Sequence, residues 1–189
     1  MKNLFQNKYR IKSTRLEHWD YSSNGAYYIT ICTKDRECYL GNVVNRKIEL
    51  SGIGEIVKKY WCVIPIYFQH VSLDEFVIMP NHLHGIVVIN NENNCRDAIN
   101  RVSTGIDNQK RFGGITKNCN PMLSKSLSTI IRWYKGRSTY EINKMQNQIH
   151  FHWQPRFYES IIRNEKQLNA IREYIINNPL NWGIDRNNS

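Results

Sequence analysis

Two histidines separated by a single residue lie within an apolar run of the chain. Residues 77–89 read VIMPNHLHGIVVI and contain His82 and His84. Side chains alternate between the two faces of a β-strand, so we expect both imidazoles on one face and Leu83 on the other. Two neighbouring imidazoles can bind a divalent cation. Two polar residues on the wet face of a half-buried strand would produce the same pattern, so the pair alone does not decide between these uses.

A tyrosine and an asparagine near the end of the chain are spaced by one helical turn. Three apolar residues predict the buried stripe of a helix there: Leu168, Ile171 and Ile175. Tyr174 lies beside that stripe, and Asn178 follows at i+4 on nearly the same face. A tyrosine at the edge of the core and an asparagine that caps the helix are the ordinary alternatives to a functional pair.

The elements that must position these residues can be predicted from the pattern of the chain. Four segments predict strands: residues 26–33, which are rich in β-branched and aromatic residues, and residues 45–51, 70–79 and 82–89. Ser51 has the position of a helix N-cap, apolar residues follow it at helical spacing, and Pro65 is predicted to end that helix. This order predicts an antiparallel sheet with a helix on one face.

The remaining segments are assigned in the same way. Residues 1–24 are basic and predicted to be irregular, and residues 90–120 lose all periodicity, which predicts a loop insertion. An amphipathic helix follows, with an apolar face and a cationic side that a solvated surface would explain: Leu123, Leu127, Ile130, Ile131 and Tyr134 against Lys125, Arg132, Lys135 and Arg137. Residues 149–163 are predicted to be extended. Asn164 and Gln167 have the spacing of a helix cap, and Pro179 is predicted to end the last helix.

The composition indicates what kind of partner the protein has. The chain has 189 residues, which fit one domain, a formal net charge of +10 and 12% aromatic residues. A cationic surface with aromatic side chains favours a polyanion such as nucleic acid. The five cysteines include no C-x-x-C pair, which argues against a disulfide framework and a thiolate zinc site. No segment reaches transmembrane length, so we expect no membrane partner and a cytoplasmic protein.

Four motifs resemble those of the HUH single-strand DNA transposases of the one-tyrosine type, most closely the REP-associated tyrosine transposases. They are MPNHLHGI at residues 79–86, WQPRFYE at residues 153–159, IRNE at residues 162–165 and YIINNP at residues 174–179. Their order and spacing agree with that family from about residue 8 to residue 182. The resemblance implies one domain over residues 1–189, with an α+β fold in which a ferredoxin-like or RRM-like antiparallel sheet has helices on one face.

The resemblance also implies the roles of individual residues. His82, His84 and Asn178 match the positions that bind Mg²⁺ or Mn²⁺, and Tyr174 matches the nucleophile. The implied reaction cleaves and rejoins single-stranded or hairpin DNA through a 5′-phosphotyrosine, in a cytoplasmic protein that associates with the nucleoid. A monomer and a homodimer are both compatible with it. A second H-x-H, His150 and His152, does not match the metal-binding position of the family.

Several residues are candidates for DNA contact by their chemistry. Arg156, Arg163, Lys135 and Arg137 can contact phosphates or a guanine edge. Trp153 and Phe157 can stack on bases, although core packing would use these aromatic residues equally well.

Two other functions are compatible with the sequence. A domesticated relative would bind hairpins of DNA or RNA without cutting them. A metal-dependent phosphodiesterase would use water in place of the tyrosine, and its cleavage would survive Tyr174→Phe. A covalent protein–DNA adduct distinguishes the transposase from both.

Overall fold

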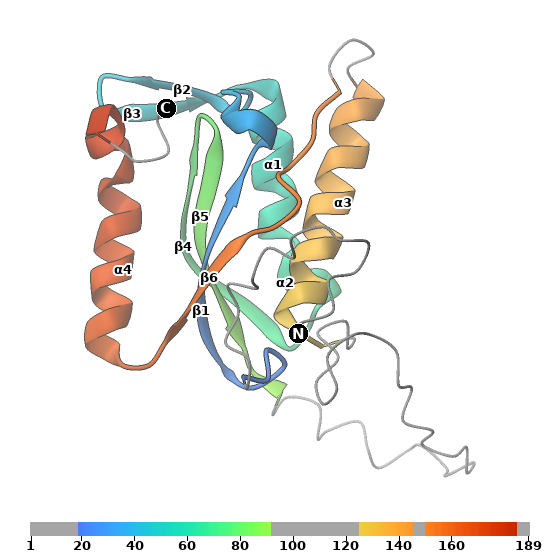
Figure 1. Ribbon diagram of the computed structural model, residues 1–189, viewed down its shortest axis with the longest axis vertical. Helices are drawn as coiled ribbons and strands as arrows, with labels where there is room; N and C mark the ends of the chain where they lie inside the picture. Colours follow the sequence, from blue (N-terminus) through green and yellow to red (C-terminus); the bar gives the residue numbers. More distant parts are fainter. Residues whose placement is uncertain (1–18, 92–124, 146–149, 185–189) are drawn as a thin grey trace, which may run out of the picture.

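The computed structural model describes residues 19–91, 125–145 and 150–184, and its centre is an antiparallel sheet (Figure 1). The four strands stand in the order β4-β5-β1-β6. Their bounds are β1 Gly25–Cys32, β4 Val71–Met79, β5 His82–Ile89 and β6 Tyr158–Ile162. The strands predicted over residues 26–33, 70–79 and 82–89 are therefore confirmed. The extended segment predicted over residues 149–163 forms a strand only in its last part.

Helices cover both faces of this sheet. Helices α1 (Gly52–Cys62) and α3 (Leu127–Met145) pack on one face, where Leu83 and Val87 of β5 join the larger apolar core. Helix α4 (Glu165–Asn177) lies on the opposite face, where Ile175 packs against Ile86. The α+β fold with an antiparallel sheet is confirmed, but the expected restriction of helices to one face does not hold for α4.

A glycine in β5 allows α1 to approach the sheet closely. A Cβ atom added to Gly85 would come within 2.4 Å of the Trp61 ring, which is fully buried. Any side chain at this position would displace Trp61 and the part of α1 that carries it. Because Gly85 faces α1, the neighbouring His84 must face α4.

The segment before α1 differs from the prediction. Residues 41–50 form a separate two-stranded hairpin, β2 Gly41–Val44 and β3 Lys47–Leu50, so the strand predicted over residues 45–51 covers only its second half. Asn45 and Arg46 turn between the strands with φ of 50° and 61°, as a type I′ turn requires. Without a glycine at the turn and with strands of four residues, the sequence gives little sign of this hairpin.

The predicted ends of two helices can be compared with the structure. Ser51 caps α1 as predicted, since its side chain accepts a hydrogen bond from the Gly54 N–H at 3.1 Å. Pro65, however, does not end the helical region, because it stands in the first turn of a short helix, α2 (Ile64–Tyr67). A missing N–H costs nothing there. Helix α4 ends at Asn177, as predicted to within one residue, and Pro179 stands in a 3₁₀ helix, η4 (Asn178–Ile184), that follows it directly.

Other predictions concern segments outside the described residues. The irregular N-terminal region, up to residue 18, and residues 92–124 of the predicted insertion fall there. Within the described ranges, no helix is both long and apolar enough to cross a membrane.

Candidate functional site

The two histidines lie side by side in the middle of the molecule. They begin β5, and their ring centroids are 4.4 Å apart. Their alternation with Leu83 is confirmed, because Leu83 belongs to the core beneath α1 and α3 while His84 contacts residues of α4. Both rings are almost completely buried, at 0% and 2% exposure. They are therefore not polar residues on a wet strand face, and their burial requires another account.

One nitrogen of each ring is held by the strand beside it or by the preceding turn. The Nδ1 atom of His82 is 2.8 Å from the Oδ1 atom of Asn81, which can only accept a hydrogen bond. The Nδ1 atom of His84 is 2.7 Å from the Tyr28 hydroxyl and 2.8 Å from the Thr30 hydroxyl, both on β1. With hydrogen on Nδ1, each imidazole presents the lone pair of Nε2.

The turn that carries Asn81 is itself fixed by Thr33, the residue that follows β1. The backbone carbonyl of Asn81 accepts hydrogen bonds from the Thr33 N–H at 2.9 Å and from the Thr33 hydroxyl at 3.0 Å. Asn81 is 2% exposed. The tight Pro80-Asn81 connection between β4 and β5 therefore places the amide that orients His82.

Helix α4 brings the predicted nucleophile to the histidines. Asn164 caps this helix, as predicted, by accepting a hydrogen bond from the Gln167 N–H at 2.8 Å. The Tyr174 hydroxyl lies 3.4 Å from the Nε2 atom of His84, and the two ring centroids are 5.4 Å apart. Tyr174 is 47% exposed as a residue, so its ring stands partly open to solvent beside the buried histidines. The structure thus joins residues that are ninety positions apart in the sequence.

Asn178 lies on the same side of the helical region. The ring of Trp182 in η4 is 6.0 Å from that of His82, centroid to centroid, while Tyr174 contacts His84. Asn178 stands four residues from each of these aromatic residues and is 1% exposed. The predicted third ligand is therefore buried, and in the sequence it stands between two residues whose rings contact the histidines.

These residues fit a divalent cation by their chemistry. Burial, and secondarily the neighbouring His82, hold the pKa of His84 well below its usual value, so this imidazole is neutral at neutral pH. Neutral imidazole nitrogens and an amide oxygen are suitable ligands for Mn²⁺ or a related ion. In the described part of the chain, no three His, Cys, Asp or Glu side chains form a group that could hold a metal. The predicted set differs from such a group because its third member is an amide.

The predicted DNA-contact residues do not form a single surface. Lys135 donates hydrogen bonds to the backbone carbonyls of Gln154 and Arg156, the latter at 3.2 Å, and burial lowers its pKa to about 8. Arg137 lies instead near Tyr60 of α1 and forms an ion pair of 3.7 Å with Glu141. Arg156 and Arg163 are exposed before and after β6.

Trp153 is a core residue in this structure. It is 7% exposed, its indole N–H donates to the Ser138 hydroxyl at 3.0 Å, and its ring packs against Tyr134 and Phe151. The expected stacking of Trp153 on a base therefore does not fit this arrangement. Phe151 is buried between exposed His150 and His152, so the second H-x-H stands on the surface, whereas the first is buried.

Four residues of the site were not singled out from the sequence. Tyr28 and Thr30 could have been found, since strand alternation places them on one face of a strand. Trp182 continues the spacing of four residues from Tyr174 through Asn178. The role of the Asn81 side chain depends on the geometry of the turn, which the sequence does not specify.

Comparisons with known proteins agree with this architecture. Residues 119–178 match the family model described as "Transposase IS200 like". The matched residues include Tyr174 and Asn178 but not His82 or His84. An uncharacterized protein of Haemophilus influenzae (strain ATCC 51907 / DSM 11121 / KW20 / Rd) is 38% identical over 177 residues, 93% of this chain and 91% of the relative.

A solved structure is similar over most of the chain. The structure of a REP-associated tyrosine transposase bound to a REP hairpin has a TM-score of 0.55 and 18% sequence identity, covering 95% of this chain and 76% of that one. At this identity the likeness concerns the fold alone. The motifs and the match of residues 119–178 support an IS200-like transposase of the one-tyrosine HUH type, and the fold agrees with that of the REP-associated tyrosine transposase.

Proposed function

We propose that this transposase cleaves and rejoins single-stranded DNA, presented beside a hairpin, through a covalent bond between Tyr174 and a 5′-phosphate. The observation that supports this most is the position of Tyr174, a half-exposed residue whose hydroxyl lies 3.4 Å from the buried His84 imidazole. A nucleophile needs both access to the substrate and a neighbour that fixes its direction. The similar REP-associated transposase was solved with a REP hairpin, which supports hairpin DNA as the substrate.

The reaction exchanges one phosphodiester for another. The Tyr174 oxygen attacks the scissile phosphorus, the bond from phosphorus to the 3′-oxygen breaks, and the departing oxygen takes a proton to become a 3′-hydroxyl. Tyr174 loses its own proton in the same exchange. Because the new phosphotyrosine bond keeps the energy of the old phosphodiester, a 3′-hydroxyl can attack it later and release Tyr174. Strands are thereby rejoined without ATP.

His82, His84 and Asn178 would hold a divalent cation at this site. A bound cation would polarise the scissile phosphate and offset the charge that develops on it. The chain contributes the rest of the arrangement. Asn81, Tyr28 and Thr30 orient the imidazoles through their Nδ1 atoms, and α4 holds the tyrosine against the same cluster. Partners of this kind usually tune a ligand as well as orient it.

The nucleophile can be tested with a single substitution. Labelled hairpin DNA with a single-stranded flank is incubated with protein and Mn²⁺ and separated on a denaturing gel. Tyr174→Phe should abolish the covalent adduct and leave hairpin binding nearly intact, because only the hydroxyl is removed. Tyr158→Phe is the matched control, since Tyr158 is also exposed, at 57%. An adduct of unchanged yield with Tyr174→Phe would refute the assignment.

The denaturing gel, together with a native gel, separates the other candidate functions. DNA that is shifted in the native gel but forms no adduct in the denaturing gel would favour a protein that binds hairpins without cutting. Cleavage that survives Tyr174→Phe would favour a phosphodiesterase that uses water.

The metal assignment has a readout independent of cleavage. Calorimetric titration of the protein with Mn²⁺ should give one site, and His82→Ala or His84→Ala should remove it by deleting a ligand. His152→Ala serves as the control because His152 is exposed and lies outside β5. Retained Mn²⁺ affinity in both ligand variants would contradict the proposed site.

A further inference from the structure

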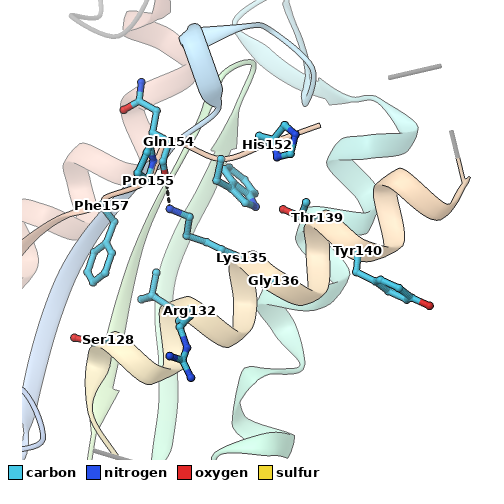
Figure 2. A pocket seen from close by; sticks show the side chains of 12 residues that line it. Ser128, Arg132, Lys135, Gly136, Thr139, Tyr140, His152, Gln154, Pro155 and Phe157 are labelled. Carbon is cyan, nitrogen blue, oxygen red and sulfur yellow. Dashed lines mark hydrogen bonds between the residues drawn. The ribbon is translucent and has the colours of Figure 1, made fainter. Parts of the chain in front are cut away.

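A groove lies on the side of the sheet opposite to the histidines and Tyr174. It runs between α3 and the segment of residues 152–157 and has a volume of about 610 Å³ (Figure 2). Its floor is apolar and includes Ile131 and Trp153. The groove shares no residue with the site formed by the histidines and α4, and nothing in the proposed reaction uses it.

Hydrogen bonds on both sides hold the walls of this groove in place. The segment is joined to β1 by the Gln154 N–H, which donates to the Cys32 carbonyl at 2.9 Å. It is joined to α3 by Trp153, whose indole donates to Ser138, and by Lys135, which reaches across to Gln154 (Figure 2). The groove is therefore a built feature of the fold and not a gap beside a loose loop.

On one wall of the groove, a glycine leaves space that a side chain would fill. Gly136 lines the groove from the middle of α3, and a Cβ atom added there would meet no atom within 4 Å. Glycine inside a helix is less favourable than alanine by about 1 kcal/mol, and no contact at Gly136 requires its small size. The open space at Gly136 therefore belongs to the groove.

The chemistry of the rim fits a nucleotide. Arg132 and His152 are exposed at the groove and can approach a phosphate, while Phe157 offers an aromatic ring beside the apolar floor. Bases stack on such rings with little regard to their identity, and a cationic rim follows the backbone. The net charge of +10 adds a general attraction for this ligand.

The edge strand connects the groove to the proposed catalytic site. Tyr158 pairs with Thr30 across β6 and β1, and the Thr30 hydroxyl is 2.8 Å from His84 Nδ1. Since paired residues point to the same face, Tyr158 faces the side of the histidines. Phe157, one residue earlier, lines the groove on the other side. A single strand of DNA that crosses the edge of the sheet at this point can therefore reach both the groove and the proposed catalytic site.

We propose that the groove between α3 and residues 152–157 binds an unstacked nucleotide of single-stranded DNA outside the catalytic site. This inference rests on the proposed function, because it assumes that the same strand reaches Tyr174. The nucleotide's base would lie against Phe157 above Gly136, and its phosphate would face Arg132 or His152.

Filling the groove tests the inference directly. The probe is a fluorescent oligothymidylate of about 20 nucleotides, which has no hairpin and suits a sequence-tolerant stack. Gly136→Leu should weaken its binding to the full-length protein about tenfold in fluorescence anisotropy, as expected for the loss of one stacked base. Gly52→Leu is the control, since a Cβ atom at Gly52, at the start of α1, also meets nothing within 4 Å. Unchanged affinity of a folded Gly136→Leu protein would overturn the inference.

A second measurement guards against misfolding of that variant. Photocrosslinking with oligothymidylate that carries 5-iodouracil should join the DNA to the segment of residues 152–157, and Phe157→Leu should remove that crosslink. Crosslinks that map only to α4 and β5 would also overturn the inference, and competition by a peptide but not by DNA would assign the groove to a protein partner.

The outcome is distinguishable from a failure of the proposed function. If no DNA forms an adduct with Tyr174 but Gly136→Leu still weakens oligothymidylate binding, the catalytic proposal fails and the groove stands. If the adduct forms and Gly136→Leu binds oligothymidylate as the parent protein does, the groove fails and the catalytic proposal stands.

Discussion

His84 has hydroxyl groups on both sides of its ring. Tyr28 and Thr30 lie at Nδ1, and Tyr174 lies at Nε2. Such an imidazole cannot easily be replaced, because its position depends on three neighbours and its burial disfavours the charged form. The neutral ring is the form that binds a metal. Burial removes the ring from water and favours this neutral form, which its proposed role requires.

The depressed pKa of His84 has a consequence for stability. An unfolded chain binds a proton at this histidine near pH 6.5, whereas the folded protein does not until the pH is much lower. As the pH falls below about 6.5, the unfolded state therefore binds more protons than the folded state, and the free energy of unfolding decreases. We expect the free energy of unfolding by urea, measured in chelator, to decrease between pH 7 and pH 5, and His84→Gln to reduce this decrease.

A matched variant makes the measurement specific. His152→Gln, at an exposed position, should retain the pH dependence of the parent protein. Equal slopes for the parent and His84→Gln would show that other groups cause the decrease.

At the scale of elements, an ion pair joins α4 to the edge strand β4. The Arg172 guanidinium donates to both carboxylate oxygens of Asp74, at 2.9 and 2.6 Å, and this bond holds the pKa of Asp74 below its usual value. Asp74 lies where the register of β4 and β5 shifts, between Leu73 and Phe76. The irregularity in β4 thus coincides with the attachment of the helix that carries Tyr174, two residues after Arg172.

We expect this ion pair to position Tyr174, the proposed nucleophile. Asp74→Asn should slow the formation of the Tyr174 adduct severalfold and leave DNA affinity nearly unchanged, because the variant loosens α4 without removing a DNA contact. Single-turnover rates on a denaturing gel, together with anisotropy, separate the two effects. Glu165→Gln is the control, since Glu165 is 3.8 Å from Arg172 and 77% exposed.

Exchange of the two charges provides the rescue. The double variant with Asp74→Arg and Arg172→Asp should recover part of the rate lost in either single variant. If the double variant and the single variants all fold but the double variant recovers no rate, the pair acts only through general stability.

The sequence predicts elements better than it predicts their arrangement. The alternation of β1 and β5 and the cap at Asn164 follow local rules, so the strands and α4 were expected at nearly their observed positions. The side of the sheet that α4 covers depends on how Ile175 packs on Ile86, which is a contact between distant segments. The burial of Trp153 beneath α3 has the same origin, and a local pattern cannot express it.

The candidate site shows the same division. His82, His84 and Tyr174 could be identified because their motifs are specific and resemble those of a family. Asn81 could not, since its role depends on the conformation of a two-residue connection. The groove at Gly136 could not be predicted either, because it exists only where α3 meets a segment that has no regular secondary structure.

At the scale of the whole molecule, the net charge of +10 should govern how DNA binding responds to salt. Each phosphate that the protein neutralises on a single strand contributes about −0.7 to the slope of log affinity against log salt. The slope therefore counts charge contacts, while the affinity at one salt concentration also includes stacking. This difference separates the two kinds of residue that line the groove.

We expect Arg132→Gln to make the slope for oligothymidylate shallower by about 0.7, which is one phosphate contact, over about 50 to 200 mM salt. Gly136→Leu should instead lower the affinity at every salt concentration and keep the slope of the parent protein, because it displaces a base and no charge. Fluorescence anisotropy with both variants and the Gly52→Leu control measures the two parameters together. A parallel line for Arg132→Gln would remove Arg132 from the path of the phosphates and leave the exposed Arg156, beside the edge strand, as the next cation to test.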